Sequence, residues 1–247
     1  LISTTEAWAQ YAVAGPNSRK LLQKIVDPAF DLSNEGFPFM ACANITVCGG
    51  LRARLFRISF SGEMAFEIAV PSRYGDALMR KLMEEGEEFN VVPYGTEALG
   101  VMRIEKGHAA GNELNGTTTA NNLGMGRMVS KKKDSIGSVL SEREGLNEDD
   151  ALKLVGIKPV DVANPTPAGA HLMTKGTAID AAHDQGYVTS ACYSPNLGHS
   201  IALAYLKSGD TRMGEIIRLV SPLTGVEHDV EVVSAHFIDP EGDRVRA

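Results

Sequence analysis

Residues 57–71 constrain the fold more than any other part of the chain. Large apolar side chains stand at every second position of the second half of this segment, at Phe66, Ile68 and Val70. In a strand, a period of two places Glu67 on the face opposite these side chains. Gly62 comes just before and supplies the positive φ that a tight turn requires. The pattern therefore predicts two strands that turn near Gly62 and carry Glu67 on their second face.

The length of the turn decides which residues lie across from each other. A two-residue turn would pair Ile58 with Glu67 and Phe60 with Ala65, which makes Phe60 a diagonal neighbour of Glu67. An aromatic ring and a carboxylate would then share a face flanked by alanines, a surface suited to a planar ligand that forms hydrogen bonds. We therefore take Glu67 and Phe60 as candidate ligand-binding residues. A solvent-exposed glutamate is the commoner meaning of this strand pattern, and position alone favours it.

Composition excludes several classes of function. The net charge of -7 over 247 residues provides no basic field, so we expect no nucleic-acid partner. The three cysteines match neither a zinc-binding spacing nor a disulfide framework, and the histidines form no metal-binding pair, so we expect no metal site and a reducing, cytoplasmic location. No run of eighteen apolar residues is present, so we expect no membrane span. The chain starts at Leu1 without a leader, and we expect it to be a piece of a longer protein.

The chain divides into two parts that differ in sequence pattern. Residues 1–145 mix helical and strand patterns, and residues 142–150 form a charged boundary with one large apolar residue. Residues 146–247 carry short strand-like runs separated by turn signals, at 152–157, 187–189, 201–206, 215–220 and 230–235. Short strands at this spacing with little helix between them predict a small antiparallel barrel. We expect an α+β protein: a mixed α/β domain over 1–145 and a β-barrel domain over 146–247.

Two basic clusters compete with Glu67 as binding features. Arg52, Arg54 and Arg57 suggest a basic stripe, but arginines on a solvated strand face are common. Residues 131–133 form the one run of three lysines, a pattern that suits a phosphate, a polyglutamate tail or RNA. No aromatic residues are interleaved with it, as single-strand binding would require. A plain solvated loop is the commoner meaning of such a run.

The ordered motifs resemble the folate-binding aminomethyltransferase family, typified by the T-protein of the glycine cleavage system. The segments that carry the resemblance are residues 13–19, 57–71, 103–107, 194–197 and 201–205. Details at 57–63, 123–134 and 189–191 are similar to one branch, the alpha subunit of heterotetrameric sarcosine oxidase. The resemblance implies an aminomethyltransferase-like region over 1–145 followed by the family's barrel.

The same resemblance implies a function. Tetrahydrofolate would be the cofactor, and it would accept a one-carbon unit from an oxidised amine to give 5,10-methylenetetrahydrofolate. The carboxylate of Glu67 matches the family glutamate that binds the pterin ring. Phe60 matches a position that is often tyrosine, so its ring remains available for stacking but the hydroxyl is missing. The partners implied are folate and the other sarcosine oxidase subunits of the parent protein.

No catalytic residue is assigned. The family's catalytic aspartate lies upstream of the segment that matches the start of this chain, so we expect the chain alone to be inactive. Two alternatives stay open beside the sarcosine oxidase reading: a T-protein-like aminomethyltransferase fragment, and a non-catalytic module for folate binding or assembly.

Overall fold

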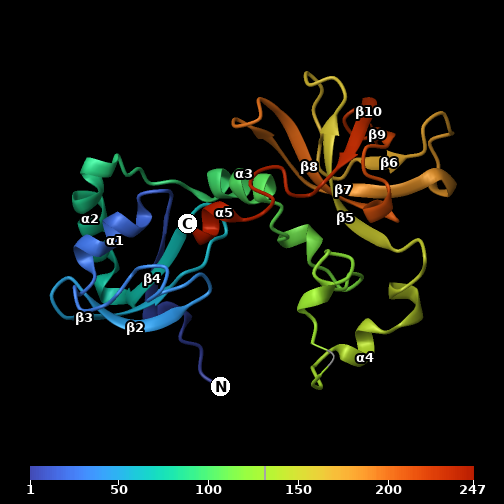
Figure 1. Ribbon diagram of the computed structural model, residues 1–247. Coiled ribbons are helices and arrows are strands. Elements are labelled where there is room, and N and C mark those ends of the chain that lie inside the picture. Colours follow the sequence, from blue (N-terminus) through green and yellow to red (C-terminus); the bar gives the residue numbers. More distant parts are fainter. Residues whose placement is uncertain (131) are drawn as a thin grey trace. The chain divides into compact units, whose positions relative to one another are not determined.

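The computed structural model describes residues 1–130 and 132–247, which form two compact units (Figure 1). The first unit comprises Leu1–Met102 and Asp239–Ala247, and the second comprises Arg103–Ile238. Helix α3, Thr96–Lys106, carries the chain from the first unit into the second. The division expected between residues 145 and 146 rests on composition and stays a prediction.

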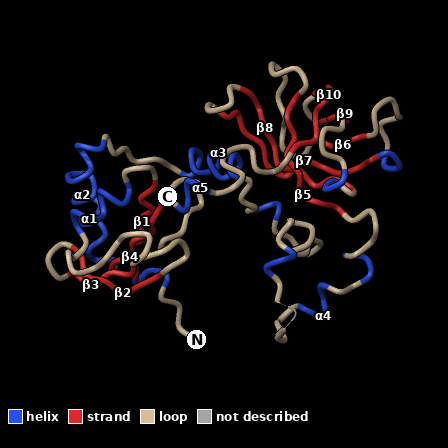
Figure 2. Tube along the Cα trace, in the orientation of Figure 1, coloured by secondary structure: helices blue, strands red, loops and turns tan. Residues whose placement is uncertain are grey.

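The first unit is built on a four-stranded antiparallel sheet in the order β1-β4-β3-β2. Its strands are β1 Trp8–Ala14, β2 Cys42–Val47, β3 Leu51–Phe56 and β4 Ala65–Pro71. Its helices are α1 Ser18–Ile25, α2 Gly75–Gly86 and the short α5 Asp243–Arg246. Helices α1 and α2 pack together and contact β4 and β1 (Figure 2).

Strand β4 supplies central side chains to the core of the first unit. Phe66, Ile68 and Val70 are fully buried on the face that meets the apolar sides of α1 and α2, including Leu22 and Leu78. Glu67 lies on the opposite face and is half-buried. The period-two prediction for this strand is therefore confirmed.

The predicted tight turn is wrong. Strand β3 ends at Phe56 and β4 begins at Ala65, and their register pairs Phe56, not Ile58, with Glu67. The chain leaves the ladder because the backbone of Arg57 bonds to segment 40–41 instead: its N–H donates to Ala41 O at 2.9 Å and its carbonyl accepts from Met40 N at 2.9 Å. Residues 57–64 therefore form a wide loop. Gly62 does adopt a positive φ, 88°, inside that loop.

The second unit contains the predicted barrel. Six antiparallel strands close in the order β10-β5-β8-β7-β6-β9 around a buried apolar core. The strands are β5 Leu152–Pro159, β6 His171–Met173, β7 Asp184–Ser194, β8 His199–Lys207, β9 Ile216–Ser221 and β10 Val226–Val233. The segment between α3 and the barrel holds the short helix α4, Ser138–Ser141. The α+β class with a small antiparallel barrel is thus confirmed, although the three-residue strand β6 was not predicted.

We expect Ile68→Ala to lower the free energy of unfolding by about 2–5 kcal/mol, because it empties a fully buried site against the helices. Ile2→Ala is the matched control, since Ile2 is 92% exposed in the same unit. Urea unfolding monitored by circular dichroism measures both. Equal, small effects from the two variants would mean that β4 does not present Ile68 to the core.

Candidate functional site

The candidate site is the face of the first unit's sheet that carries Glu67. In the ladder Glu67 lies between Ala12 on β1 and Phe56 on β3, and Ala65 and Ala69 share its face of β4. An aromatic side chain therefore stands directly across from the carboxylate. Alanines flank Glu67 along β4, and Arg54, which pairs with Ala69, lies on the same face. The expected combination of residue types is present, but the register assigns the neighbouring ring to Phe56.

Gln10 fixes one side of the carboxylate. It lies across from Ala69, one diagonal step from Glu67, and its side-chain amide Nε2 donates a hydrogen bond to Glu67 Oε2. A hydrogen bond from an amide donor stabilises the ionised carboxylate and limits its rotation. The alternation of Trp8, Gln10 and Ala12 in β1 places Gln10 on this face, but sequence alone does not give the offset between β1 and β4.

Tyr94 belongs to the same neighbourhood. Burial raises the pKa of its phenol, and the negative charge of Glu67 raises that pKa further. A charge effect of this kind requires the phenol and the carboxylate to lie near each other. Tyr94 comes from the loop that precedes α3. No periodic sequence pattern in this loop indicates which way its side chain points. The site thus draws on β1, β3, β4 and this loop.

Phe60 lies in the 57–64 loop and is 39% exposed. It does not pair with Ala65, because that part of the loop is outside the strand ladder. Its role as a stacking or wall residue stays a prediction. Within the same loop, the hydroxyls of Ser59 and Ser61 accept hydrogen bonds from the N–H groups of Gly62 and Glu63.

The predicted arginine stripe is divided by the structure. Arg52 and Arg54 are exposed on β3, where the Arg54 guanidinium lies 4.0 Å from the centre of the Trp8 ring. Arg57 is 1% exposed and turns away from them into the unit. Of the predicted lysine run, Lys132 and Lys133 are exposed and Lys131 lies outside the described residues.

Inside the second unit, side chains of the 103–107 motif form hydrogen bonds with side chains of the motifs at 189–191 and 194–197. The guanidinium of Arg103 donates to Glu113 Oε2 at 2.9 Å and to Ser190 Oγ at 2.7 Å, and Ser190 Oγ donates to Glu113 Oε1 at 2.6 Å. Glu105 accepts hydrogen bonds from Ser194 Oγ and from Asn196 Nδ2. These contacts join the end of α3 to the strand β7 and the turn after it.

Glu113 is fully buried, and its environment decides its charge state. Burial raises the pKa of this carboxyl, but hydrogen bonds from Ser190, Thr189 and Ala110 N–H, together with the charge of Arg103, outweigh burial and lower it below the usual 4.5. The carboxylate is therefore ionised and satisfied, which suits a structural ion pair.

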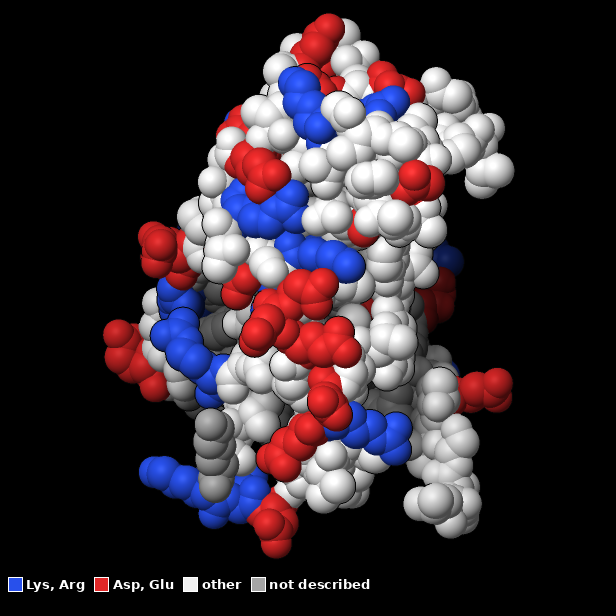
Figure 3. Space-filling view, turned by 90° about the vertical axis from the view of Figure 1, so that its right-hand side faces the viewer, with Lys and Arg blue, Asp and Glu red and all other residues white. Residues whose placement is uncertain are grey.

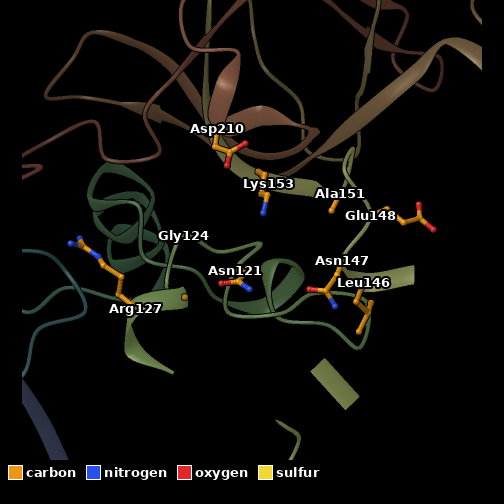
Figure 4. A pocket seen from close by; sticks show the side chains of 10 residues that line it. Asn121, Gly124, Arg127, Leu146, Asn147, Glu148, Ala151, Lys153 and Asp210 are labelled. Carbon is orange, nitrogen blue, oxygen red and sulfur yellow. The ribbon is translucent and has the colours of Figure 1, made fainter. Parts of the chain in front are cut away.

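A polar cavity of about 450 Å³ lies in the second unit. Its walls come from the turn around Gly124, segment 146–151, the start of β5 and η8, Gly209–Thr211. In Figure 4, Asn121, Asn147 and Lys153 surround one space, whereas Arg127 and Glu148 point away from it. No aromatic residue lines this cavity, so it lacks the flat apolar wall of a stacking site.

Two features are absent from the described residues: a metal-binding cluster and a membrane-spanning helix. No group of three or more His, Cys, Asp or Glu side chains in this part of the chain is placed to hold a metal ion. None of the helices among these residues has the length and apolarity needed to cross a membrane. On the face drawn in Figure 3, acidic and basic side chains are interspersed.

Comparison with known proteins places the chain in a family. The family model for the GCVT N-terminal domain matches residues 1–133, and the model for the glycine cleavage T-protein C-terminal barrel domain matches residues 153–239. The chain belongs to the glycine cleavage T-protein family. The family predicted from the ordered motifs is confirmed.

Its relatives come from two groups. The chain is 45% identical to the sarcosine oxidase subunit alpha of Rhizobium meliloti (strain 1021) and 41% identical to that of Corynebacterium sp. (strain P-1), over 99% and 98% of its own length. It is 32% identical to an aminomethyltransferase of Thermoanaerobacter sp. (strain X514) over 86% of its length. It spans 25% of each sarcosine oxidase subunit and 55% of the aminomethyltransferase.

The fold is that of a solved aminomethyltransferase. The crystal structure of the glycine cleavage system aminomethyltransferase T from Bartonella henselae matches with a TM-score of 0.74 at 24% identity. The match covers 94% of this chain and 60% of that one. The predicted aminomethyltransferase-like architecture is therefore confirmed.

We expect Glu67→Gln to lower the pKa of Tyr94, because the substitution removes a negative charge that opposes formation of the tyrosinate. The absorbance of tyrosinate during an alkaline titration measures it. A parallel titration of Tyr94→Phe identifies the contribution of Tyr94 among the six tyrosines. If the pKa of Tyr94 is the same in the wild type and in Glu67→Gln, the charge of Glu67 does not act on Tyr94 and the two residues do not share a site.

The pair formed by Arg103 and Glu113 should make the second unit sensitive to acid. Because the pKa of Glu113 is lowered in the folded state, its ionised form adds stability above the usual 4.5, and this contribution is lost as the pH falls through the folded-state pKa. We therefore expect Glu113→Gln to be less stable than the wild type at neutral pH, and the difference to shrink on acidification to about pH 3.

Urea unfolding across that pH range tests the acid sensitivity, with Glu148→Gln, an exposed glutamate of the same unit, as the control. A difference between the wild type and Glu113→Gln that stays constant with pH would contradict an ionised, charge-stabilised Glu113.

Proposed function

We propose that this chain is the tetrahydrofolate-binding part of a sarcosine oxidase alpha subunit. In the whole protein a one-carbon unit from the oxidised amine would pass to tetrahydrofolate and give 5,10-methylenetetrahydrofolate. The observation that carries the proposal is a glutamate carboxylate set beside an aromatic ring, with alanines on either side of it in β4, in a member of the glycine cleavage T-protein family. The identities of 45% and 32% favour the sarcosine oxidase branch over the aminomethyltransferases.

The residues present fit a pterin ring. The amino-pyrimidinone edge of a pterin carries adjacent N–H donors, and a carboxylate accepts two such bonds side by side. Gln10 holds Glu67 through Oε2 and so restricts the direction in which the carboxylate presents its remaining acceptor sites. Phe56 supplies an aromatic surface next to it, and Phe60 is a second candidate for stacking. Bound tetrahydrofolate would supply the nitrogen nucleophiles that take up the one-carbon unit.

The chain's own residues would bind and orient. Glu67 would anchor the ring, the aromatic side chains would exclude water from one face of it, and Tyr94 would remain protonated beside the carboxylate because both burial and the Glu67 charge raise its pKa. No residue of this chain is assigned as the catalytic acid or base. The chain spans a quarter of the sarcosine oxidase subunits it resembles, so the transfer reaction is proposed for the whole protein, and the partners would be its other subunits.

We expect Glu67→Gln to weaken tetrahydrofolate binding by the whole protein by about 1–3 kcal/mol, or about 5- to 150-fold in Kd, because ring N–H donors would lose their charged acceptor. Titration calorimetry measures the affinity. Glu87→Gln, an exposed glutamate of the same unit, is the matched control and should bind like the wild type. An unchanged Kd for Glu67→Gln would remove the pterin-anchor role. In a separate turnover assay, this chain alone should show no one-carbon transfer.

A further inference from the structure

Segment Asp239–Ala247 returns from the second unit and is built into the first. It contains α5, whose Val245 is 7% exposed, and Asp239 Oδ1 accepts a hydrogen bond from Asp243 N–H at 2.9 Å at the start of that helix. Figure 1 shows α5 close to the sheet of the first unit. The segment is therefore a fixed part of the unit that carries Glu67.

The contacts of the segment converge on the loop that leads into β4. Arg57, the first residue of the 57–64 loop, donates through Nη2 to Ala247 O at 2.8 Å and to Arg246 O at 3.3 Å. Its Nη1 donates to Phe37 O at 2.8 Å. Near the other end of the loop, Arg244 Nη1 lies 2.6 Å from Glu63 Oε1. Segment 239–247 thus holds the loop at both ends.

A buried guanidinium makes the first of these contacts costly to lose. Arg57 is 1% exposed, and its described acceptors are backbone carbonyl oxygens, two of them in segment 239–247. Burial lowers the pKa of Arg57, and the charge of the nearby Arg19 lowers it further. Arg19 Nη2 also donates to Ala247 O, at 2.9 Å. Two cationic side chains therefore donate to the same backbone oxygen.

The loop that is held in this way carries Phe60 and continues into Glu67. At its end, Met64 O accepts hydrogen bonds from Gly15 N–H at 2.8 Å and from Ser18 Oγ at 3.2 Å, so the entry to β4 is fixed as well. Between these anchors the loop has no strand partner. The contacts at Arg57 and Glu63 therefore add to the hydrogen bonds that Ser59 and Ser61 accept within the loop.

We propose that segment 239–247 positions the ligand-binding face: through Arg57, Glu63 and Arg244 it sets the 57–64 loop, and thereby the position of Phe60 relative to Glu67. The inference rests on the proposed function. Arg57, Glu63 and Arg244 are positioning residues, which act on the ligand through the loop rather than by touching it. This arrangement also makes residues 244–247 determinants of affinity for a pterin.

The Glu63–Arg244 pair gives the cleanest test, because both side chains are partly exposed, at 31% and 52%, and their loss should leave the fold intact. We expect Glu63→Gln and Arg244→Gln each to weaken tetrahydrofolate binding by the whole protein about two- to fivefold without a change in Tm. The exchanged pair, Glu63→Arg with Arg244→Glu, should restore the affinity. The control pair is Asp76→Asn and Arg80→Gln, which breaks a fully surface-exposed ion pair of α2.

Hydrogen exchange of the 57–64 amides is measured on the same variants and needs no ligand. Exchange should accelerate in Glu63→Gln and Arg244→Gln, return to the wild-type rate in the exchanged pair and stay unchanged in the control pair. Unchanged exchange and unchanged affinity would overturn the inference, as would faster exchange with unchanged affinity. If the wild-type protein itself fails to bind tetrahydrofolate, the proposed function is wrong, and the exchange rates still decide whether segment 239–247 holds the loop.

Discussion

The double pairing of β4 is the constraint on which the first unit depends. The strand bonds to β1 on one side and to β3 on the other, so its two faces are fixed by neighbours on both edges. A shift of one residue would move Ile68 out of the core and Glu67 into it, at the cost of burying a charge. The same ladder that closes the core therefore holds Glu67, Gln10 and Phe56 on the opposite face. The register of β4 therefore determines both which of its side chains enter the core and which face the candidate site.

Arg57 shows how a buried charge redirects the chain. In the sequence it follows β3 directly, and a strand continued through it would have allowed a tight turn. The structure instead buries its guanidinium, whose two terminal nitrogens donate to carbonyl oxygens of residues 37, 246 and 247, while Nε has no acceptor among the described residues. Leaving such a group without acceptors in the interior would be costly, so the chain bends to reach them. The wide 57–64 loop is the result.

The features that sequence predicted are those set by local periodicity. Alternation in β4 identified the buried side of the strand, and short apolar runs with turn signals identified the barrel. The features that it missed depend on partners far away in the chain. The acceptors of Arg57 in segment 239–247 are 189 and 190 positions from it, and the offset that brings Gln10 to Glu67 spans 57 positions. Tyr94 comes from a loop without periodicity. A single sequence contains no local signal for such pairings.

The motifs that carried the family resemblance do not all serve the same purpose. Arg103 forms an ion pair with Glu113 and also binds Ser190, and Glu105 accepts hydrogen bonds from Ser194 and Asn196, so both charged groups have partners inside the second unit. Such groups are explained by folding alone, because each would be costly to bury without the other. Glu67 differs: it is partly exposed, and among the described residues its hydrogen bond comes from Gln10. A half-satisfied carboxylate beside an aromatic ring has acceptor capacity left for a ligand. This is why the functional proposal rests on Glu67 rather than on the more deeply buried ion pairs.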